Sequence, residues 1–277
     1  MIDRLGRVQL LRAESGELNN FLRQLPDNAW DEPSACQGWS VGDVLGHLTG
    51  QDFSLRILRG LQGNVLPPEG SPQIVSHNED AFAESIFNRG ISTKMELGNN
   101  LLATFEQRVS DIIQVFEQVR PDQWDTLCYW PPGPEAVSTM LDMRISELTM
   151  HAWDIRSRFD LDYHLSRGSV SVLMDTVDRA VRRAFRPDPD LENPKQYRFI
   201  VDHDSEREVG IVLSKNGGSV EPAKGDSYYA TFRCDGETYV MIMYGRIKPI
   251  DATARGLLLC DNGQVRVEEF ESHFKGG

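Results

Sequence analysis

The spacing of apolar residues changes along the sequence. Before about residue 187 it is typical of helices, and after that point apolar residues tend to recur at every second position. In residues 8–25, Val8, Leu11, Leu18 and Leu22 recur in steps typical of a helix that rests on a core. Similar spacing predicts further helices over residues 40–58, 91–119, 134–159 and 167–185. The first half of the chain is therefore predicted to form an antiparallel four-helix bundle with additional helical segments.

Polar and helix-breaking residues mark where these helices begin and end. Pro26 ends the first helix, and Ser40 is predicted to cap the second, with Asp43 in the first turn where negative charge suits the helix dipole. Residues 60–73 are rich in glycine and proline and are predicted to form a long loop, a candidate wall for a binding site.

The pattern changes after residues 186–195, where three prolines favour a linker. Strands are predicted from β-branched and aromatic residues, and residues 251–260 are predicted as a short helix leading into a strand. The five predicted strands cover residues 197–202, 208–214, 227–235, 238–245 and 263–270. The predicted fold class is α plus α+β, with a helical domain over residues 1–186 and a smaller antiparallel-sheet domain over residues 195–277.

Composition and charge exclude several classes of function. A net charge of −13 without a cluster of basic residues argues against binding to nucleic acid. The chain has no apolar run near the roughly 20 residues of a membrane span, and its first residues lack the apolar core of a secretion signal. Four separated cysteines form no CxxC pair and are predicted to be reduced thiols. A cytoplasmic location without membrane attachment is expected.

Glu147 and His151 are the first candidates for chemistry, because residues four apart share one face of a helix. They could direct a carboxylate oxygen and an imidazole nitrogen to one metal ion, or form an ordinary surface pair. A catalytic zinc ion takes three protein ligands, and His47 inside another predicted helix is the best third candidate. The other four histidines, in predicted loops or in the C-terminal half, are interpreted as surface residues.

Two segments, "CQGWSVGDVLGHL" at 36–48 and "RISELTMHAWDIRSR" at 144–158, resemble the signature segments of the mycothiol-dependent maleylpyruvate isomerase family. This family is a branch of the DinB-like metal-binding helical bundles. The segment "ATFRCDGETYVMIMYGR" at 230–246 and the end of the chain resemble the sterol-carrier-like domain that often follows such bundles. The resemblance implies a DinB-like bundle with a sterol-carrier-like C-terminal domain.

The same resemblance implies roles for individual residues. The family's metal ligands correspond to His47, Glu147 and His151. The expected ion is a divalent metal, with zinc as the first candidate. Asp154 falls on the family's aspartate and is a catalytic candidate, either as a hydrogen-bond partner of His151 or as a general base for the thiol proton. In the isomerases an arginine from the second domain contributes to the site, and Arg246 is its best match in this sequence. The loose alignment there also leaves Arg233 and Arg255 open.

Together, these expectations predict that the protein is a mycothiol-dependent metalloenzyme. A free thiol with a pKa near 8.5 is mostly protonated at neutral pH, whereas coordination to a metal deprotonates it. The activated sulfur would serve S-transfer or addition to a small electrophile, and maleylpyruvate-type cis–trans isomerisation is one form of this chemistry. A monomer or homodimer is expected.

Two alternatives come from other classes. One is a non-catalytic protein that binds an apolar ligand in its second domain and uses the metal structurally. The other is a metal hydrolase that needs no thiol, although the His-Glu-x-x-His pattern of many such enzymes is missing.

Overall fold

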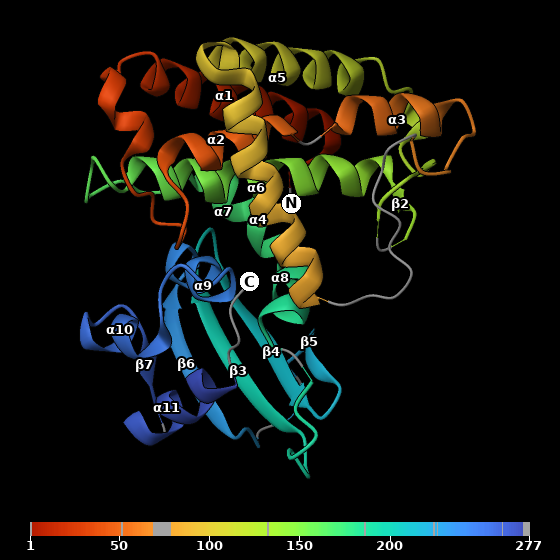
Figure 1. The fold of residues 1–277 in the computed structure, drawn as a ribbon. Helices are drawn as coiled ribbons and strands as arrows, with labels where there is room; N and C mark the ends of the chain where they lie inside the picture. The colour runs from red at the N-terminus through yellow and green to blue at the C-terminus, as the bar shows by residue number, and fades with distance from the viewer. Residues whose placement is uncertain are drawn as a thin grey trace. The chain divides into compact units, whose positions relative to one another are not determined.

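A computed structural model of the chain describes residues 2–50, 52–68, 79–131, 133–185, 187–223, 225, 227–261 and 263–273. Its contacts divide the chain into two compact units, Ile2–Leu165 and Ser166–Gly277. The first unit is helical and the second combines helices with a sheet (Figure 1). The predicted fold class, a helical part followed by an α+β part, is confirmed.

The helical unit is built around four helices that enclose one core. Helices α1 and α2 each pack against both α5 and α6 (Figure 1). Helices α3 and α4 are added to this bundle, and a short hairpin of β1 and β2 precedes α6. The bounds are α1 Arg4–Leu22, α2 Val41–Gly50, α3 Phe53–Leu61, α4 Glu79–Leu97, α5 Leu101–Glu117, α6 Val137–Arg156, β1 Leu127–Cys128 and β2 Glu135–Ala136.

The start of α2 has the cap predicted from the sequence. Ser40 Oγ accepts a hydrogen bond from the Asp43 backbone N–H at 3.2 Å, and Asp43 Oδ2 accepts one from the Ser40 backbone N–H at 2.9 Å. This reciprocal arrangement satisfies two N–H groups that the helix itself leaves unbonded. It fixes the first turn of the helix that carries His47.

Two predicted helices of the helical unit are divided in the structure. The segment 40–58 breaks after Gly50, and α3 starts anew with the Asp52 carboxylate accepting from the Leu55 backbone N–H at 3.0 Å. The segment 91–119 breaks at Gly98, whose φ of +48° lies in the left-handed region that favours glycine. The helix before that break, α4, begins at Glu79 rather than at residue 91.

The C-terminal unit is a five-stranded sheet with helices. The strand order is β5-β4-β3-β6-β7, and all neighbours are antiparallel except β3 and β6. The sheet is thus mixed, although antiparallel pairs dominate as expected. The bounds are α7 Arg167–Asp175, α8 Val177–Ala184, β3 Lys195–Asp202, β4 Glu206–Ser214, β5 Gly217–Pro222, β6 Ala230–Asp235, α9 Gly236–Met243, α10 Pro249–Ala254, β7 Leu259–Cys260 and α11 Gln264–Ser272.

The border between the units lies earlier than the sequence suggested. Helices α7 and α8 fall in the predicted segment 167–185, but they pack on α9 and β5 of the sheet unit. Gly218 of β5 lies against Val181 and Phe185, and any larger side chain there would collide with them. The contacts therefore divide the chain between Leu165 and Ser166, whereas the sequence pattern placed the border at 186–195.

Two predicted strands are helices. Residues 238–245 fall largely in α9, whose first turn is capped by the Asp235 carboxylate accepting from the Thr238 N–H at 2.7 Å. Residues 263–270 fall in α11. An apolar run buried on every side shows neither period clearly, so the spacing could not distinguish a buried strand from a buried helix in α9. The short helix and strand predicted over residues 251–260 are confirmed as α10 and β7.

Aromatic rings fill the interior of this unit. Phe270 of α11 contacts Tyr197, Phe199 and Phe232 of the sheet, with ring centroids 4.9 to 5.6 Å apart. These four residues have no exposed surface. Across the described part of the chain, no helix combines the length and the apolar character that crossing a membrane requires.

Candidate metal centre

Three side chains from two bundle helices converge on one point. His47 comes from α2, and Glu147 and His151 come from α6. One ligand atom from each residue lies within 4.8 Å of the other two. Glu147 Oε2 is 2.8 Å from His47 Nε2 and 3.7 Å from His151 Nε2. The i, i+4 spacing on α6 and the packing of α2 on α6 thus bring together the three residues expected from the sequence.

This donor set fits a divalent metal ion. Two imidazole nitrogens and one carboxylate oxygen form a known catalytic zinc set, with bonds of about 2.0–2.2 Å. Tetrahedral bonds of that length separate neighbouring ligand atoms by about 3.3 Å. The observed separations of 2.8 and 3.7 Å lie on either side of that value. Because all three atoms also lie within 4.8 Å of one another, side-chain adjustments would allow them to coordinate one ion.

Asp154 contacts Nδ1 of His151, the ring nitrogen that is not part of the candidate ligand set. Asp154 Oδ2 lies 2.8 Å from His151 Nδ1, and the Asp154 side chain is only 1% exposed. A hydrogen bond from Nδ1–H to this carboxylate keeps the proton on Nδ1 and leaves Nε2 as the ligand atom. Carboxylate–histidine pairs of this kind orient metal ligands and increase their basicity.

His47 is enclosed in the bundle, and its environment favours the neutral ring. The residue is 7% exposed, and burial is the main cause that lowers the pKa of its imidazole. The hydrogen bond to Glu147 acts in the opposite direction. A neutral imidazole is the form that can bind a metal, so burial favours coordination at neutral pH.

Two arginines, the buried Arg144 and the exposed Arg108, stabilise the last turn of α2, directly after His47. The guanidinium of Arg144 donates to the Leu48 carbonyl at 3.2 Å, and Arg108 donates to the Thr49 carbonyl. These carbonyls belong to the last turn of α2, where positive charge is favourable. Burial lowers the pKa of Arg144 to about 10, so this guanidinium stays charged at neutral pH.

Trp39 covers both histidines. Its ring centroid lies 5.1 Å from that of His47 and 5.9 Å from that of His151, and the side chain is 5% exposed. Phe87 of α4 stacks on the indole with ring centroids 5.7 Å apart, and the indole N–H donates to the Phe87 carbonyl. The sequence indicated Trp39 only as part of a motif, whereas the structure makes it a wall of the centre.

Close packing of α2 on α4 completes this side of the centre. A Cβ atom at Gly46 would lie 2.3 Å from the Gly90 carbonyl oxygen, and one at Gly90 would lie 3.3 Å from the His47 Cβ. Gly42, Gly46 and Gly50 are four residues apart, which puts them on one stripe of α2. This spacing is a sequence signal for close helix packing that the pattern of apolar residues did not reveal.

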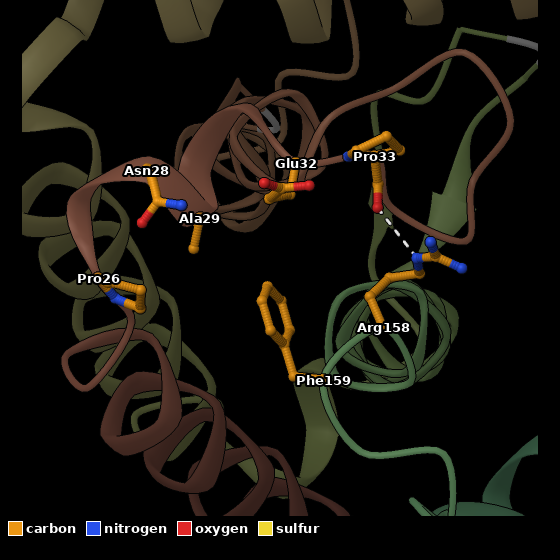
Figure 2. Close-up of a pocket in the computed structure, with 7 residues that line it drawn as sticks. All are labelled: Pro26, Asn28, Ala29, Glu32, Pro33, Arg158 and Phe159. Carbon is orange, nitrogen blue, oxygen red and sulfur yellow. Dashed lines mark hydrogen bonds between the residues drawn. The ribbon is translucent and has the colours of Figure 1, made fainter.

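A hollow of about 190 Å³ lies beside the segment that carries Trp39. Figure 2 shows the Phe159 ring standing among the residues that line it, which are Pro26, Asn28, Ala29, Glu32, Pro33 and Arg158. Arg158 Nε donates to the Pro33 carbonyl at 3.1 Å, and the Ala35 N–H donates to the Asp154 carbonyl at 2.8 Å. These bonds attach residues 33–35 to the end of α6, and the lining does not include the triad.

The remaining residues singled out from the sequence belong to other elements. Arg246 follows α9 in the C-terminal unit and donates to the Tyr244 carbonyl at 2.8 Å, so its expected contribution to the site stays a prediction. His164 is exposed, as expected. His203 is not a surface residue, because its side chain is 9% exposed and its Nε2 lies 2.9 Å from Ser171 Oγ. His77 and part of the predicted loop lie outside the described residues.

Comparison with known proteins identifies the family. Two solved structures, the mycothiol-dependent maleylpyruvate isomerase and a histidine-to-alanine mutant of it, share the fold with a TM-score of 0.62. They are 15% and 14% identical to this chain, and each alignment covers 95% of it and 94% of the known structure. No curated protein matches the sequence significantly. The sequence model of the mycothiol maleylpyruvate isomerase N-terminal domain matches residues 11–156, more than half of the chain, and the chain therefore belongs to this family.

Proposed function

We propose that this protein is a metal-dependent enzyme that uses mycothiol as a nucleophilic co-substrate. The sulfur would attack a small electrophile, in S-transfer or in reversible addition, and cis–trans isomerisation of a maleylpyruvate-type substrate is one form of the reaction. The observation that carries the proposal is the convergence of His47, Glu147 and His151 within the domain that matches the family. The reaction is proposed for the cytoplasm.

The three converging residues would hold the ion, with zinc as the proposed metal. A divalent metal bound there would lower the pKa of a coordinated thiol and keep it as a thiolate at neutral pH. Glu147 contributes a negative charge that stabilises the bound cation, and the two histidines contribute neutral nitrogens. Trp39 shields the histidines from water on one side.

The position of Asp154 supports one of the two roles considered for it. Its carboxylate is almost completely buried and lies against His151 Nδ1. A general base must contact the proton that it removes, within about 2.6–3.2 Å or through one water. Asp154 is better suited to hold the Nδ1 proton of His151 and so to direct Nε2 at the metal. We therefore propose Asp154 as a positioning residue.

The donor set argues against a purely structural metal. Structural zinc ions usually have four protein ligands, whereas the cluster found among the described residues offers three. A site with three ligands leaves a coordination position for a substrate. The aromatic rings that fill the C-terminal unit also give little support to an apolar-ligand-binding protein. If Asp154 holds the His151 ring, it is also not available as the general base that a thiol-independent hydrolase would need.

Metal analysis combined with a thiol-consumption assay tests the proposal. Wild-type protein should contain about one zinc ion per chain and should consume mycothiol in the presence of chlorodinitrobenzene or maleylpyruvate. His47→Ala should lose both the metal and the activity. His164→Ala removes an exposed histidine of the same unit and should behave like the wild type.

Two results would contradict the proposal. Full retention of zinc by His47→Ala would exclude the triad as the metal site. Turnover of esters or amides by the wild type without any thiol, together with no mycothiol consumption, would favour the hydrolase.

A further inference from the structure

Four arginines from four different helices surround the junction between α2 and α3. Arg108 and Arg144 have a structural explanation, because they bind the carbonyls at the end of α2. Arg56 of α3 and Arg89 of α4 have no such explanation. Concentrated positive charge is unexpected in a chain with a net charge of −13.

Arg56 is held in place by aromatic rings. Its guanidinium carbon lies 5.6 Å from the centroid of Tyr129 and 5.1 Å from that of Trp130. Stacking on aromatic faces leaves the N–H edges of a guanidinium available. Among the residues that the structure describes, none forms a hydrogen bond or an ion pair with the Arg56 guanidinium. This half-buried cation is therefore fixed in position without a bonded counter-ion.

Arg89 brings a second positive charge to the same place. Burial is the main cause that lowers the pKa of Arg56, and repulsion from Arg89 adds to it. Both arginines border the junction between α2 and α3: the Arg89 Cγ lies 3.9 Å from the position of a Cβ atom on Gly50, at the end of α2. The Trp130 ring under Arg56 lies 5.8 Å from the ring of Phe53, at the start of α3. Asp52, which is exposed, provides some opposing charge. Within the described chain, Arg89 also forms no hydrogen bond or ion pair. Two neighbouring guanidinium groups in this state are suited to receive an anion.

Arg89 lies along α2, the helix that carries His47. A Cβ atom at Gly50, one residue after the last turn carbonyls of α2, would lie 3.9 Å from the Arg89 Cγ. Gly90, the next residue of α4, packs on His47. The Arg89 side chain therefore extends along α2, from the level of His47 towards the C-terminal end of that helix. One turn of a helix corresponds to about 5 Å along its axis. One helical turn is a length that a small substrate can span.

We propose that Arg56 and Arg89 bind a carboxylate of the electrophilic substrate while its reactive carbon faces the metal-activated thiol. This inference rests on the proposed function and narrows it to an anionic electrophile. Guanidinium groups bind carboxylates through paired N–H···O bonds, which fix orientation as well as position. Correct orientation of the reacting carbon is the main benefit that such a contact brings to catalysis.

Binding of succinate to the zinc-loaded protein tests the pair independently of turnover. Succinate carries two carboxylates but has no double bond to which a thiol can add. Arg56→Gln and Arg89→Gln should each weaken succinate binding in calorimetry by about tenfold or more, the loss expected for a hydrogen bond between charged groups. Arg89→Lys keeps the positive charge but lacks the paired N–H groups of a guanidinium, and it should recover part of the affinity. Arg182→Gln, at an exposed arginine of α8, is the control and should bind as the wild type does.

Further readouts separate this inference from a structural role and from the proposed function. The glutamine variants should keep their zinc and their kcat with a neutral electrophile, while KM for an anionic electrophile rises. Unchanged succinate affinity in both variants, or no succinate binding by the wild type, would overturn the inference, even if mycothiol turnover is intact. A lower unfolding temperature with unchanged affinity would show that stacking on Tyr129 and Trp130 is the only role of Arg56. Loss of succinate binding in a protein that does not use mycothiol would leave the anion site standing and reject the proposed function.

Discussion

Asp154 Oδ2 lies 2.8 Å from Nδ1 of His151, three residues earlier on α6. This contact determines which ring nitrogen of His151 faces Glu147 and His47. A buried carboxylate therefore controls the geometry of the centre without being one of the three converging groups.

Asp154→Asn should weaken metal binding without removing it. The asparagine oxygen can still accept the Nδ1 proton, but the negative charge that increases the basicity of His151 is lost. Substitutions behind a metal ligand typically reduce metal affinity 10- to 100-fold. Competition with a chelator of known zinc affinity measures the change. Unaltered affinity would show that the Asp154–His151 contact does not tune the site.

Replacement of Gly46 by alanine should lower both the stability of the protein and its affinity for zinc, although Gly46 is not a metal ligand. The new Cβ would lie 2.3 Å from the Gly90 carbonyl oxygen, so α2 and α4 would have to separate. Overpacking of this kind destabilises by about 1–3 kcal/mol. Because His47 also packs on Gly90, zinc affinity should fall as well.

Gly16→Ala is the matched control for that change. Gly16 lies within α1, and no atom lies within 4 Å of the position of its added Cβ. Alanine there should stabilise the protein by about 0.5–1 kcal/mol, because the unfolded chain loses freedom. Denaturant unfolding measures both variants, and equal effects of the two substitutions would contradict the close packing of α2 on α4.

Fluorescence of Trp39 should report on metal binding. Its ring lies against both histidines, so zinc binding should change its emission. Trp39→Phe should remove most of the zinc-dependent change that the wild type shows. Trp124→Phe, at a buried tryptophan stacked on Phe116, is the control and should keep it. The same zinc-dependent change in Trp39→Phe would place the metal elsewhere.

Cys128 should not compete with mycothiol as a nucleophile. Burial raises the pKa of its thiol to about 11. Below that pH the thiol is protonated, so at pH 8 only about one molecule in a thousand carries the thiolate. Iodoacetamide should therefore modify Cys128 slowly in the folded protein, with a rate that rises about tenfold per pH unit up to pH 11. Cys128→Ser should keep mycothiol-dependent activity, and its loss would assign the chemistry to a protein thiol.

The sequence predicted the centre better than its surroundings. Glu147, His151 and Asp154 share one helix, so their common face follows from spacing alone. The approach of His47 depends on how α2 packs on α6, and only the family resemblance made that pairing specific. Arg56 and Arg89 come from different helices and follow no motif, so no pattern in the sequence could have paired them.

The errors in the predicted fold have a similar origin. Helix α9 is apolar on all sides because it is buried on all sides, and its residues therefore show no clear period. The break at Gly98 depends on a backbone conformation that the apolar stripe does not encode. The segment 167–185 was correctly predicted to be helical, although as one helix instead of α7 and α8. Its packing on α9 and β5 of the sheet unit is not specified by the local sequence.

The most direct test of the central claim is X-ray absorption at the zinc edge of the metal-loaded protein with and without mycothiol. Without mycothiol, only nitrogen and oxygen neighbours at about 2.0–2.2 Å are expected. With mycothiol, the account predicts one additional sulfur neighbour at about 2.3 Å, and this sulfur should be missing when the thiol is replaced by its S-methyl ether. A spectrum that mycothiol leaves unchanged, in a protein that consumes the thiol, would contradict activation of the sulfur at the metal.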